Sequence, residues 1–118
     1  METKILTKRD VLKQKTLKTE TVDIPEWGGS LIVQEMTAAQ RDSFEDWVLS
    51  KGDDKSSKGT RVAIIINTVV DENGKPFFTD LDALELGKKP GIIIDRIASV
   101  GLRLSGMSEG SIKEEVKN

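Results

Sequence analysis

Two runs of alternating residues, separated by a proline and a pair of glycines, constrain the fold of this chain more than any other feature. In the first run, KTETVDI, Val22 and Ile24 share one face, the pattern of a half-buried strand. Pro25 ends that strand because proline has no N–H to donate to a neighbour. Gly28 and Gly29 tolerate the backbone of a tight turn, and SLIVQEM alternates again after them. The sequence therefore predicts a β-hairpin.

A helix is predicted directly after the hairpin. Thr37 and Gln40 have the spacing of a capping box, in which each side chain accepts a hydrogen bond from the other residue's backbone N–H. Phe44, Trp47 and Val48 follow at the i, i+3, i+4 spacing of one apolar helix face. We expect this face to pack into the core.

The tryptophan in the hairpin turn has two interpretations. Trp27 beside Gly28 could serve as a stacking or cation–π platform for a ligand. The chain has two Trp, three Phe and no Tyr, which is too few for a stacking surface. We therefore expect Trp27 and Trp47 to be packing anchors, with Trp27 holding the hairpin on the helices.

The segment RVAIIINTVV, residues 61–70, is ambiguous by periodicity because it is apolar nearly all round. Its β-branched residues favour a strand, whereas its length and Thr60 as N-cap favour a buried helix. The dipeptide Asn73-Gly74 then predicts a turn.

Two more helices are expected near the end of the chain. The first begins at Thr79 as N-cap, turns Leu81 and Leu84 inward and ends at Gly87. The second runs from Pro90 to Gly106. Its expected core face is traced by Ile93, Ile97, Val100 and Leu104, with Gly101 as a point of close approach to another element.

Composition and charge limit the function. Without Cys or His, the chain lacks disulfides, thiolate zinc ligands and the usual general base. A calcium loop at 71–82 and a phosphate loop at 52–60 both fail at required positions. Adjacent carboxylates are read as cap and loop charges. We expect no catalytic residue, no metal and no cofactor.

The charge is unevenly distributed. Residues 1–18 hold six basic and two acidic side chains, so this arm carries +4; the whole chain is at −2, which leaves −6 on the remainder. We interpret the arm as a solvated surface, with an acidic or nucleic-acid partner as the alternative. The net negative charge argues against nucleic acid. No run is long enough to span a membrane, and no signal peptide is recognised, so a cytoplasmic protein is expected.

These patterns together predict one α+β domain, residues 1–118, with an N-terminal antiparallel β-hairpin packed against four to five helices. Residues 51–59 are expected to form a flexible polar loop. Residues 107–118 are expected to form either a short helix or a frayed tail.

Two motifs at this spacing resemble the tail assembly chaperones of long-tailed phages and of prophages of Gram-positive bacteria. The first is carried by Pro25, Glu26, Trp27, Gly28 and Gly29, then Thr37, Ala38, Arg41, Asp42 and Phe44. The second is carried by Val70, Asp71, Glu72, Gly74, Lys75, Pro76, Phe78, Thr79 and Asp80. The resemblance spans residues 5–118, and nothing is carried over from it to the polar loop at 51–59. It favours the helical interpretation of residues 61–70.

The resemblance implies a non-catalytic role in the host cytoplasm. Such chaperones bind the long, largely helical tape measure protein, keep it soluble until tail tube subunits polymerise around it, and are not retained in the virion. The resemblance leaves open three further partners: the tail tube protein, a longer frameshifted form of the chain, and a second copy. The end at Asn118 fits the shorter product of such a frameshift.

The family motif is structural, so it assigns no binding residues. We place tape measure binding at Ile112, Glu114, Glu115 and Val116 and at exposed apolar positions of the last long helix. The alternative function is a structural virion component such as a connector or a minor tail protein. A regulatory nucleic-acid binder that uses the basic arm is the second rival.

Overall fold

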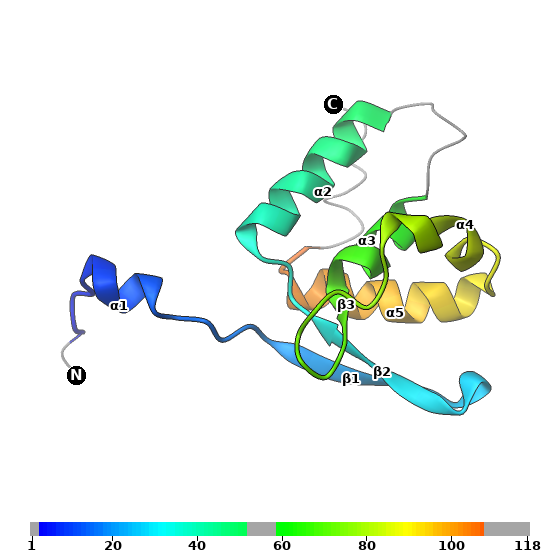
Figure 1. Cartoon of the computed structure of the whole chain (residues 1–118), viewed down its shortest axis with the longest axis horizontal. Helices are drawn as coiled ribbons and strands as arrows, with labels where there is room; N and C mark the ends of the chain where they lie inside the picture. Colours follow the sequence, from blue (N-terminus) through cyan, green and yellow to red (C-terminus); the bar gives the residue numbers. More distant parts are fainter. Residues whose placement is uncertain (1–2, 52–58, 108–118) are drawn as a thin grey trace.

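The structure is a computed structural model that describes residues 3–51 and 59–107. It is an α+β fold, as predicted, with a three-stranded antiparallel sheet in the order β1-β2-β3 and helices packed against it (Figure 1). The elements are α1 (Lys8–Leu12), β1 (Thr19–Ile24), the 3-10 turn η1 (Pro25–Trp27), β2 (Gly29–Gln34), α2 (Ala38–Lys51), α3 (Thr60–Thr68), β3 (Val69–Val70), the 3-10 turn η2 (Asp80–Asp82), α4 (Ala83–Leu86) and α5 (Gly91–Leu104).

The predicted hairpin is confirmed, with a tighter turn than expected. β1 pairs with β2 from Thr19 opposite Gln34 to Ile24 opposite Gly29. Gly28 alone supplies the left-handed backbone, with φ of 74°, and its N–H donates to the carbonyl of Pro25 at 3.1 Å. Gly29 is therefore the first residue of β2 and not part of the turn.

The ambiguous segment forms both structures in succession. It is helical through Thr68, as the resemblance favoured, and then becomes a strand. Val69 and Val70 pair with Val33 and Ile32 of β2, which extends the hairpin to a three-stranded sheet. The β-branched residues at the end of the run thus reach a sheet edge, whereas those before them are buried in α3.

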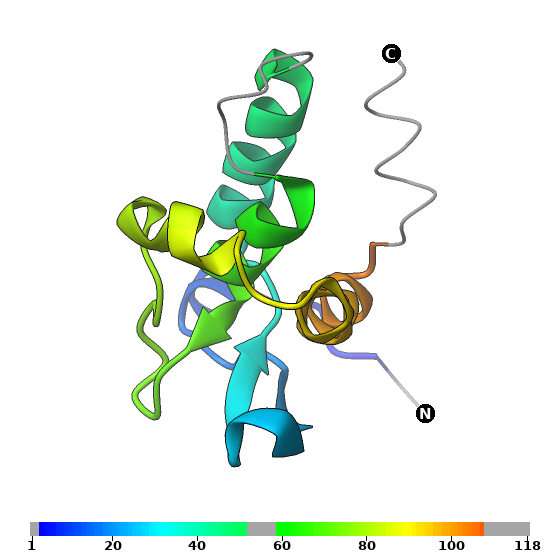
Figure 2. The same cartoon turned by 90° about the vertical axis from the view of Figure 1, so that its right-hand side faces the viewer.

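The core lies where α3 packs on α5 and both meet the sheet. Figure 2, which looks along α5, shows α3 between α4 and α5 with the sheet below. Val33, Phe44, Ile65 and Ile97 are among the side chains with at most 1% exposure. Gly101 is the close contact between the two helices: a Cβ built there would lie 2.7 Å from Oγ1 of Thr68. The expected close approach is therefore confirmed.

Local capping signals are confirmed at two helix starts and one helix end. The Thr37 N–H donates to Oε1 of Gln40 at 2.9 Å, and the Gln40 N–H donates to Oγ1 of Thr37 at 3.1 Å. Thr79 likewise caps η2. After α5, Gly106 has φ of 72° and the Met107 N–H donates to the carbonyl of Leu102 at 2.8 Å, a Schellman closure.

The inward positions predicted after Thr79 are wrong. Leu81 and Leu84 are 93% and 73% exposed, and Leu86 is the buried leucine. The prediction assumed one helix with a regular period. Instead, η2 has three residues per turn before α4 begins, and this change of period rotates a different leucine toward α3.

Two arginine–glutamate pairs fasten the hairpin to α5. Both guanidinium NH groups of Arg96 donate to the Glu26 carboxylate, at 2.8 and 2.7 Å, and Arg103 donates to both oxygens of Glu20 at 2.7 and 2.8 Å. The hydrogen bonds from Arg96 lower the pKa of Glu26 to about 2. Because the arginines are seven residues apart, they lie on one face of α5.

The N-terminal arm, residues 3–18, stands clear of the body in Figure 1. Its helix α1 has a capping box, since Thr7 and Asp10 each accept a hydrogen bond from the other's N–H. None of the α1 side chains is buried.

Within the described residues, no helix is long and apolar enough to cross a membrane.

Candidate protein-binding groove

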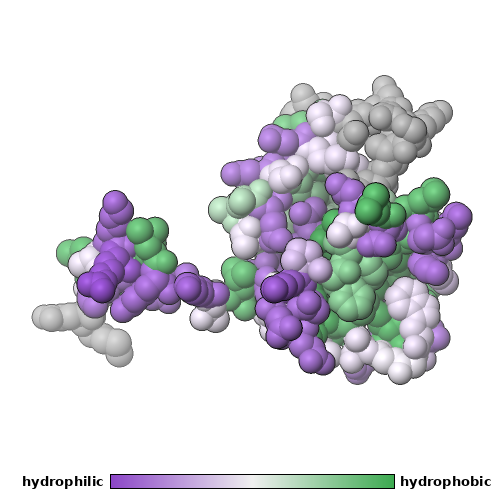
Figure 3. All heavy atoms as spheres, viewed as in Figure 1, coloured by the Kyte–Doolittle hydropathy of each residue, from purple (hydrophilic) through white to green (hydrophobic). Residues whose placement is uncertain are grey.

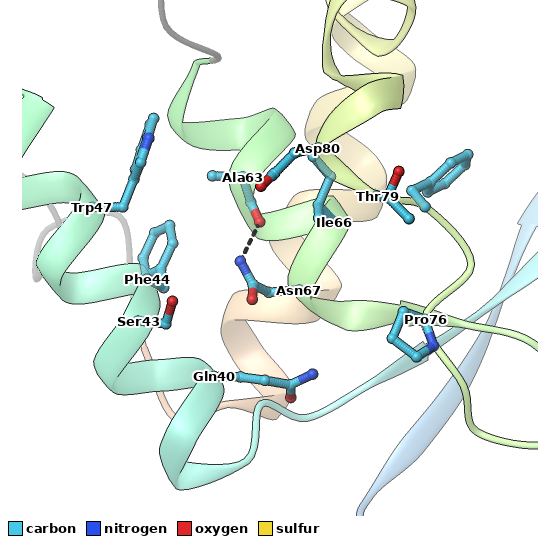
Figure 4. A pocket seen from close by; sticks show the side chains of 11 residues that line it. Gln40, Ser43, Phe44, Trp47, Ala63, Ile66, Asn67, Pro76, Thr79 and Asp80 are labelled. Atoms are coloured by element: carbon cyan, nitrogen blue, oxygen red, sulfur yellow. Dashed lines mark hydrogen bonds between the residues drawn. The ribbon is translucent and has the colours of Figure 1, made fainter.

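A groove of about 450 Å³ opens between α2, α3 and the loop that leads from β3 to η2. We call it the aromatic groove. Figure 4 shows the side chains of all three elements turned toward one space. Its lining consists of Gln40, Ser43, Phe44, Trp47, Ala63, Ile66, Asn67, Pro76, Phe78, Thr79 and Asp80.

Two stacked aromatic rings form the α2 wall of this groove. The centroids of Phe44 and Trp47 lie 6.3 Å apart, and their planes differ by 24°. Phe44 is 1% exposed and belongs to the core, whereas Trp47 is half-buried. The wall is therefore anchored from behind by Phe44 and presents apolar surface through Trp47.

Amide side chains border the groove and are held by local hydrogen bonds. Nδ2 of Asn67 donates to the carbonyl of Ala63 at 2.8 Å, and Gln40 is held by the capping box that it forms with Thr37. Asp80 contributes a carboxylate at the η2 side. A hollow that combines apolar walls with fixed polar groups suits a partner helix whose apolar stripe is bordered by polar side chains.

The surface around the groove is also apolar with a polar border. Figure 3 shows apolar surface gathered in the middle of the body, between α2 and the hairpin, and bordered by hydrophilic residues. Among the residues that the structure describes, no three of the metal-ligating side chains Cys, His, Asp and Glu are grouped to hold a metal ion.

The predicted residues have different positions relative to this groove. Phe44 and Trp47 line it, and both pack as predicted, but Trp47 alone of the two also presents accessible surface. Pro25, Gly28 and Gly29 build the hairpin end, as described above. Asn73 and Gly74 form the predicted turn: the Asn73 N–H donates to Oδ1 of Asp71 at 2.8 Å, and Gly74 has φ of 79°.

The predicted anchoring role of Trp27 is wrong. Its side chain is 45% exposed at the end of the hairpin. The hairpin is fastened there by the Glu26–Arg96 pair instead, which leaves the indole outside the core. An aromatic residue in a turn is apolar, but the turn conformation decides which way it points.

The predicted partner-binding residues Ile112, Glu114, Glu115 and Val116 lie outside the described residues. On α5, the strongly exposed apolar side chain is Ile92, at 73%. Sequence reasoning missed Ile66, Asn67 and Phe78 as groove residues. The first two fall in the run that is apolar nearly all round, where no pattern separates a core-facing from a groove-facing side.

Comparison with known proteins gives a consistent result. The family model described as phage tail assembly chaperone matches residues 7–118. The solved structure of the bacteriophage HK97 tail assembly chaperone has a similar fold, with a TM-score of 0.58 at 17% identity. The similarity covers 86% of this chain and 95% of that one. No curated protein sequence matches this chain significantly.

Proposed function

This chain belongs to the phage tail assembly chaperone family, and from that premise we propose that it binds the tape measure protein and keeps it soluble while the tail is built. The family's role in assembly is that of a chaperone and not of a catalyst. We further propose that the chain acts in the host cytoplasm and is left out of the finished virion.

The observation that supports this proposal is the aromatic groove. A long helical protein with an exposed apolar stripe aggregates unless that stripe is covered. A hollow of about 450 Å³ has room for a few apolar side chains from about one turn of a helix. Each copy would then cover a short stretch with moderate affinity, and many copies bound along one tape measure protein would be released one after another as the tube grows.

The C-terminal residues are the second surface that we propose for the same partner. Ile112 and Val116 are spaced i, i+4, which on a helix places two apolar side chains on one face. Binding at the groove and binding at the C-terminal residues predict different results, so one experiment can compare the two surfaces.

The test is co-expression of tagged chaperone with the tape measure protein, followed by pull-down and measurement of the soluble fraction of the tape measure protein. Ser43→Arg places a long cation in the groove from an exposed position on α2. Ser99→Arg, at an exposed position of α5 outside the groove, is the matched control. Ile112→Asp/Val116→Asp tests the C-terminal surface.

If the groove carries binding, Ser43→Arg reduces retention and the control does not. If the C-terminal surface carries it, the double variant alone reduces retention. A wild-type chain that neither retains the tape measure protein nor raises its soluble fraction would refute the proposed function. Abundant chain in purified virions, measured by mass spectrometry, would favour the alternative of a structural component.

A further inference from the structure

Two leucines that follow the aromatic groove in the chain are strongly exposed. Leu81 of η2 and Leu84 of α4 have exposed fractions of 93% and 73%. Neither belongs to the hydrophobic core, and neither lines the aromatic groove. Leu86, two residues further on, is buried. The segment therefore places one leucine in the core and holds two others in solvent.

Leu81 and Leu84 lie on the same side of their segment. The turn η2 passes directly into α4 at Ala83, without a loop between them. Side chains three residues apart eclipse one another in a 3-10 turn, and they are neighbours on one face of an α-helix. The two leucines thus form one exposed apolar surface, which we call the leucine ridge.

The leucine ridge is held in place by the fold of the single chain. Oγ1 of Thr79 accepts the N–H of Leu81 at 3.2 Å, and the Thr79 N–H donates to Oδ2 of Asp82 at 2.8 Å. At the other end of the segment, Leu86 fixes α4 to the core. The backbone that carries the exposed leucines is ordered before a partner arrives, which reduces the entropy lost on binding.

The leucine ridge continues one wall of the aromatic groove. Thr79 and Asp80 line that groove, as Figure 4 shows, and Leu81 is the next residue in the chain. In Figure 2, η2 and α4 lie on the side of α3 that faces away from α5. Groove and ridge together offer a longer apolar surface than the single helical turn for which the groove has room.

The border of this combined surface is acidic. Among the described residues that line the aromatic groove, Asp80 carries the one charge. Residues 79–86 hold three acidic side chains, Asp80, Asp82 and Glu85, and no basic one. Nζ of Lys88 lies 3.4 Å from Oε1 of Glu85, which leaves a net negative charge around the leucines. A partner with positive charges beside its apolar residues would complement this border.

We propose that a partner helix lies across the aromatic groove and the leucine ridge together. The apolar stripe of this helix extends over at least about two turns and is bordered by Lys and Arg. The inference rests on the proposed function, because it takes an amphipathic helix such as one of the tape measure protein as the occupant. It adds the length and the charge of the segment that one copy covers.

The test measures the binding of two labelled synthetic peptides to the full chain by fluorescence anisotropy. Both peptides are amphipathic helices of about five turns with the same leucine stripe. One carries lysines beside the stripe, and the other carries glutamates.

The ridge variant is Leu81→Ser/Leu84→Ser. Leu49→Ser, at a 57% exposed position of α2 that does not line the aromatic groove, is the matched control. The same chains are compared in the pull-down of the tape measure protein. Circular dichroism melts verify that every variant is folded.

We expect the wild type and the control to bind the lysine peptide more tightly than the glutamate peptide. This difference should shrink at high salt because exposed charges are screened. In the ridge variant, the dissociation constant of the lysine peptide should rise by about tenfold or more, since one buried leucine contributes about that factor. The ridge variant should also retain less tape measure protein than the control.

Four results would overturn the inference. The first is a wild type that binds neither peptide. The second is a ridge variant that binds the lysine peptide and the tape measure protein as tightly as the wild type. The third is a glutamate peptide that binds at least as tightly as the lysine peptide. The fourth is a ridge variant that loses only self-association, measured by sedimentation velocity, which would assign the ridge to a second copy of the chain.

The proposed function fails by a different result. A wild type that does not retain the tape measure protein, but binds the lysine peptide through Leu81 and Leu84, would refute the proposed partner. The same result would support the combined surface as a site for a basic amphipathic helix.

Discussion

Replacing Gly101 by alanine should destabilise the protein, although alanine is the better helix former. The added Cβ would lie 2.7 Å from Oγ1, 3.0 Å from Cγ2 and 3.1 Å from Cβ of Thr68, whereas ordinary contacts begin at 3.4 Å. Rotation of Thr68 gives no relief because its own Cβ is already too close. Thr68 is fully buried, and its hydroxyl donates to the carbonyl of Ile64 at 2.7 Å. The α3 and α5 helices must therefore move apart.

The magnitude follows from two opposing effects. Alanine in a helix interior gains about 1 kcal/mol over glycine. Overpacking a close-packed core costs about 1–3 kcal/mol, and here the shortest contact is about 0.7 Å inside the ordinary limit. We expect Gly101→Ala to lower the free energy of unfolding by about 1–2 kcal/mol. Gly91→Ala, at the first position of the same helix and with open space around its Cβ, should raise it by up to about 0.5 kcal/mol, because only part of the helix-interior gain applies at a helix end.

Urea unfolding followed by circular dichroism measures both changes as free energies. A double-mutant cycle then identifies the cause. Thr68→Ala removes the two nearest atoms, so in its presence Gly101→Ala should cost at least about 1 kcal/mol less than in the wild type. If Gly101→Ala is as stabilising as Gly91→Ala, the close-approach reasoning is refuted.

Three more predictions concern the hairpin, the helix caps and the core. The Glu26–Arg96 pair holds the pKa of Glu26 at about 2 against an ordinary 4.5, so the stabilisation from this pair is complete above about pH 4.5 and is lost as the pH falls toward 2. Urea unfolding of Glu26→Gln should show a shallower loss of stability in that pH window. An acid profile unchanged from the wild type would contradict this. Thr37→Ala should lower the free energy of unfolding by about 1 kcal/mol because it removes the cap of a helix that packs on the core. Thr7→Ala should leave global unfolding unchanged because α1 has no buried residue. Equal effects of the two substitutions on urea unfolding would refute this difference. Phe44→Ala should cost about 3–5 kcal/mol in the same assay, since the ring is 1% exposed, and a cost below about 1 kcal/mol would show that the ring is not part of the core.

Several features of the candidate site could be predicted because their signals are local. The capping box at Thr37 requires only Gln40 three residues later, and the α2 face requires only the spacing of Phe44 and Trp47. The other wall of the aromatic groove could not be predicted. Ile66 and Asn67 lie in a segment that is apolar nearly all round, and Phe78 reaches the groove through a loop whose path depends on distant contacts.

The sequence by itself determined the hairpin, most of the caps and most helix positions, because each depends on residues within about four positions of one another. The N-cap expected at Thr60 is an exception, since Thr60 is the first residue of α3 and Gly59 is its N-cap. Only the tertiary structure decided that Val69 and Val70 join the sheet, that Leu86 is buried in place of Leu81, and that Trp27 stays exposed. Each of these outcomes depends on partners that are distant in the chain: β2 for the valines, α3 for Leu86, and Arg96 of α5 for the hairpin end. A local pattern specifies which face is apolar, but the surface that covers this face is supplied by the rest of the fold.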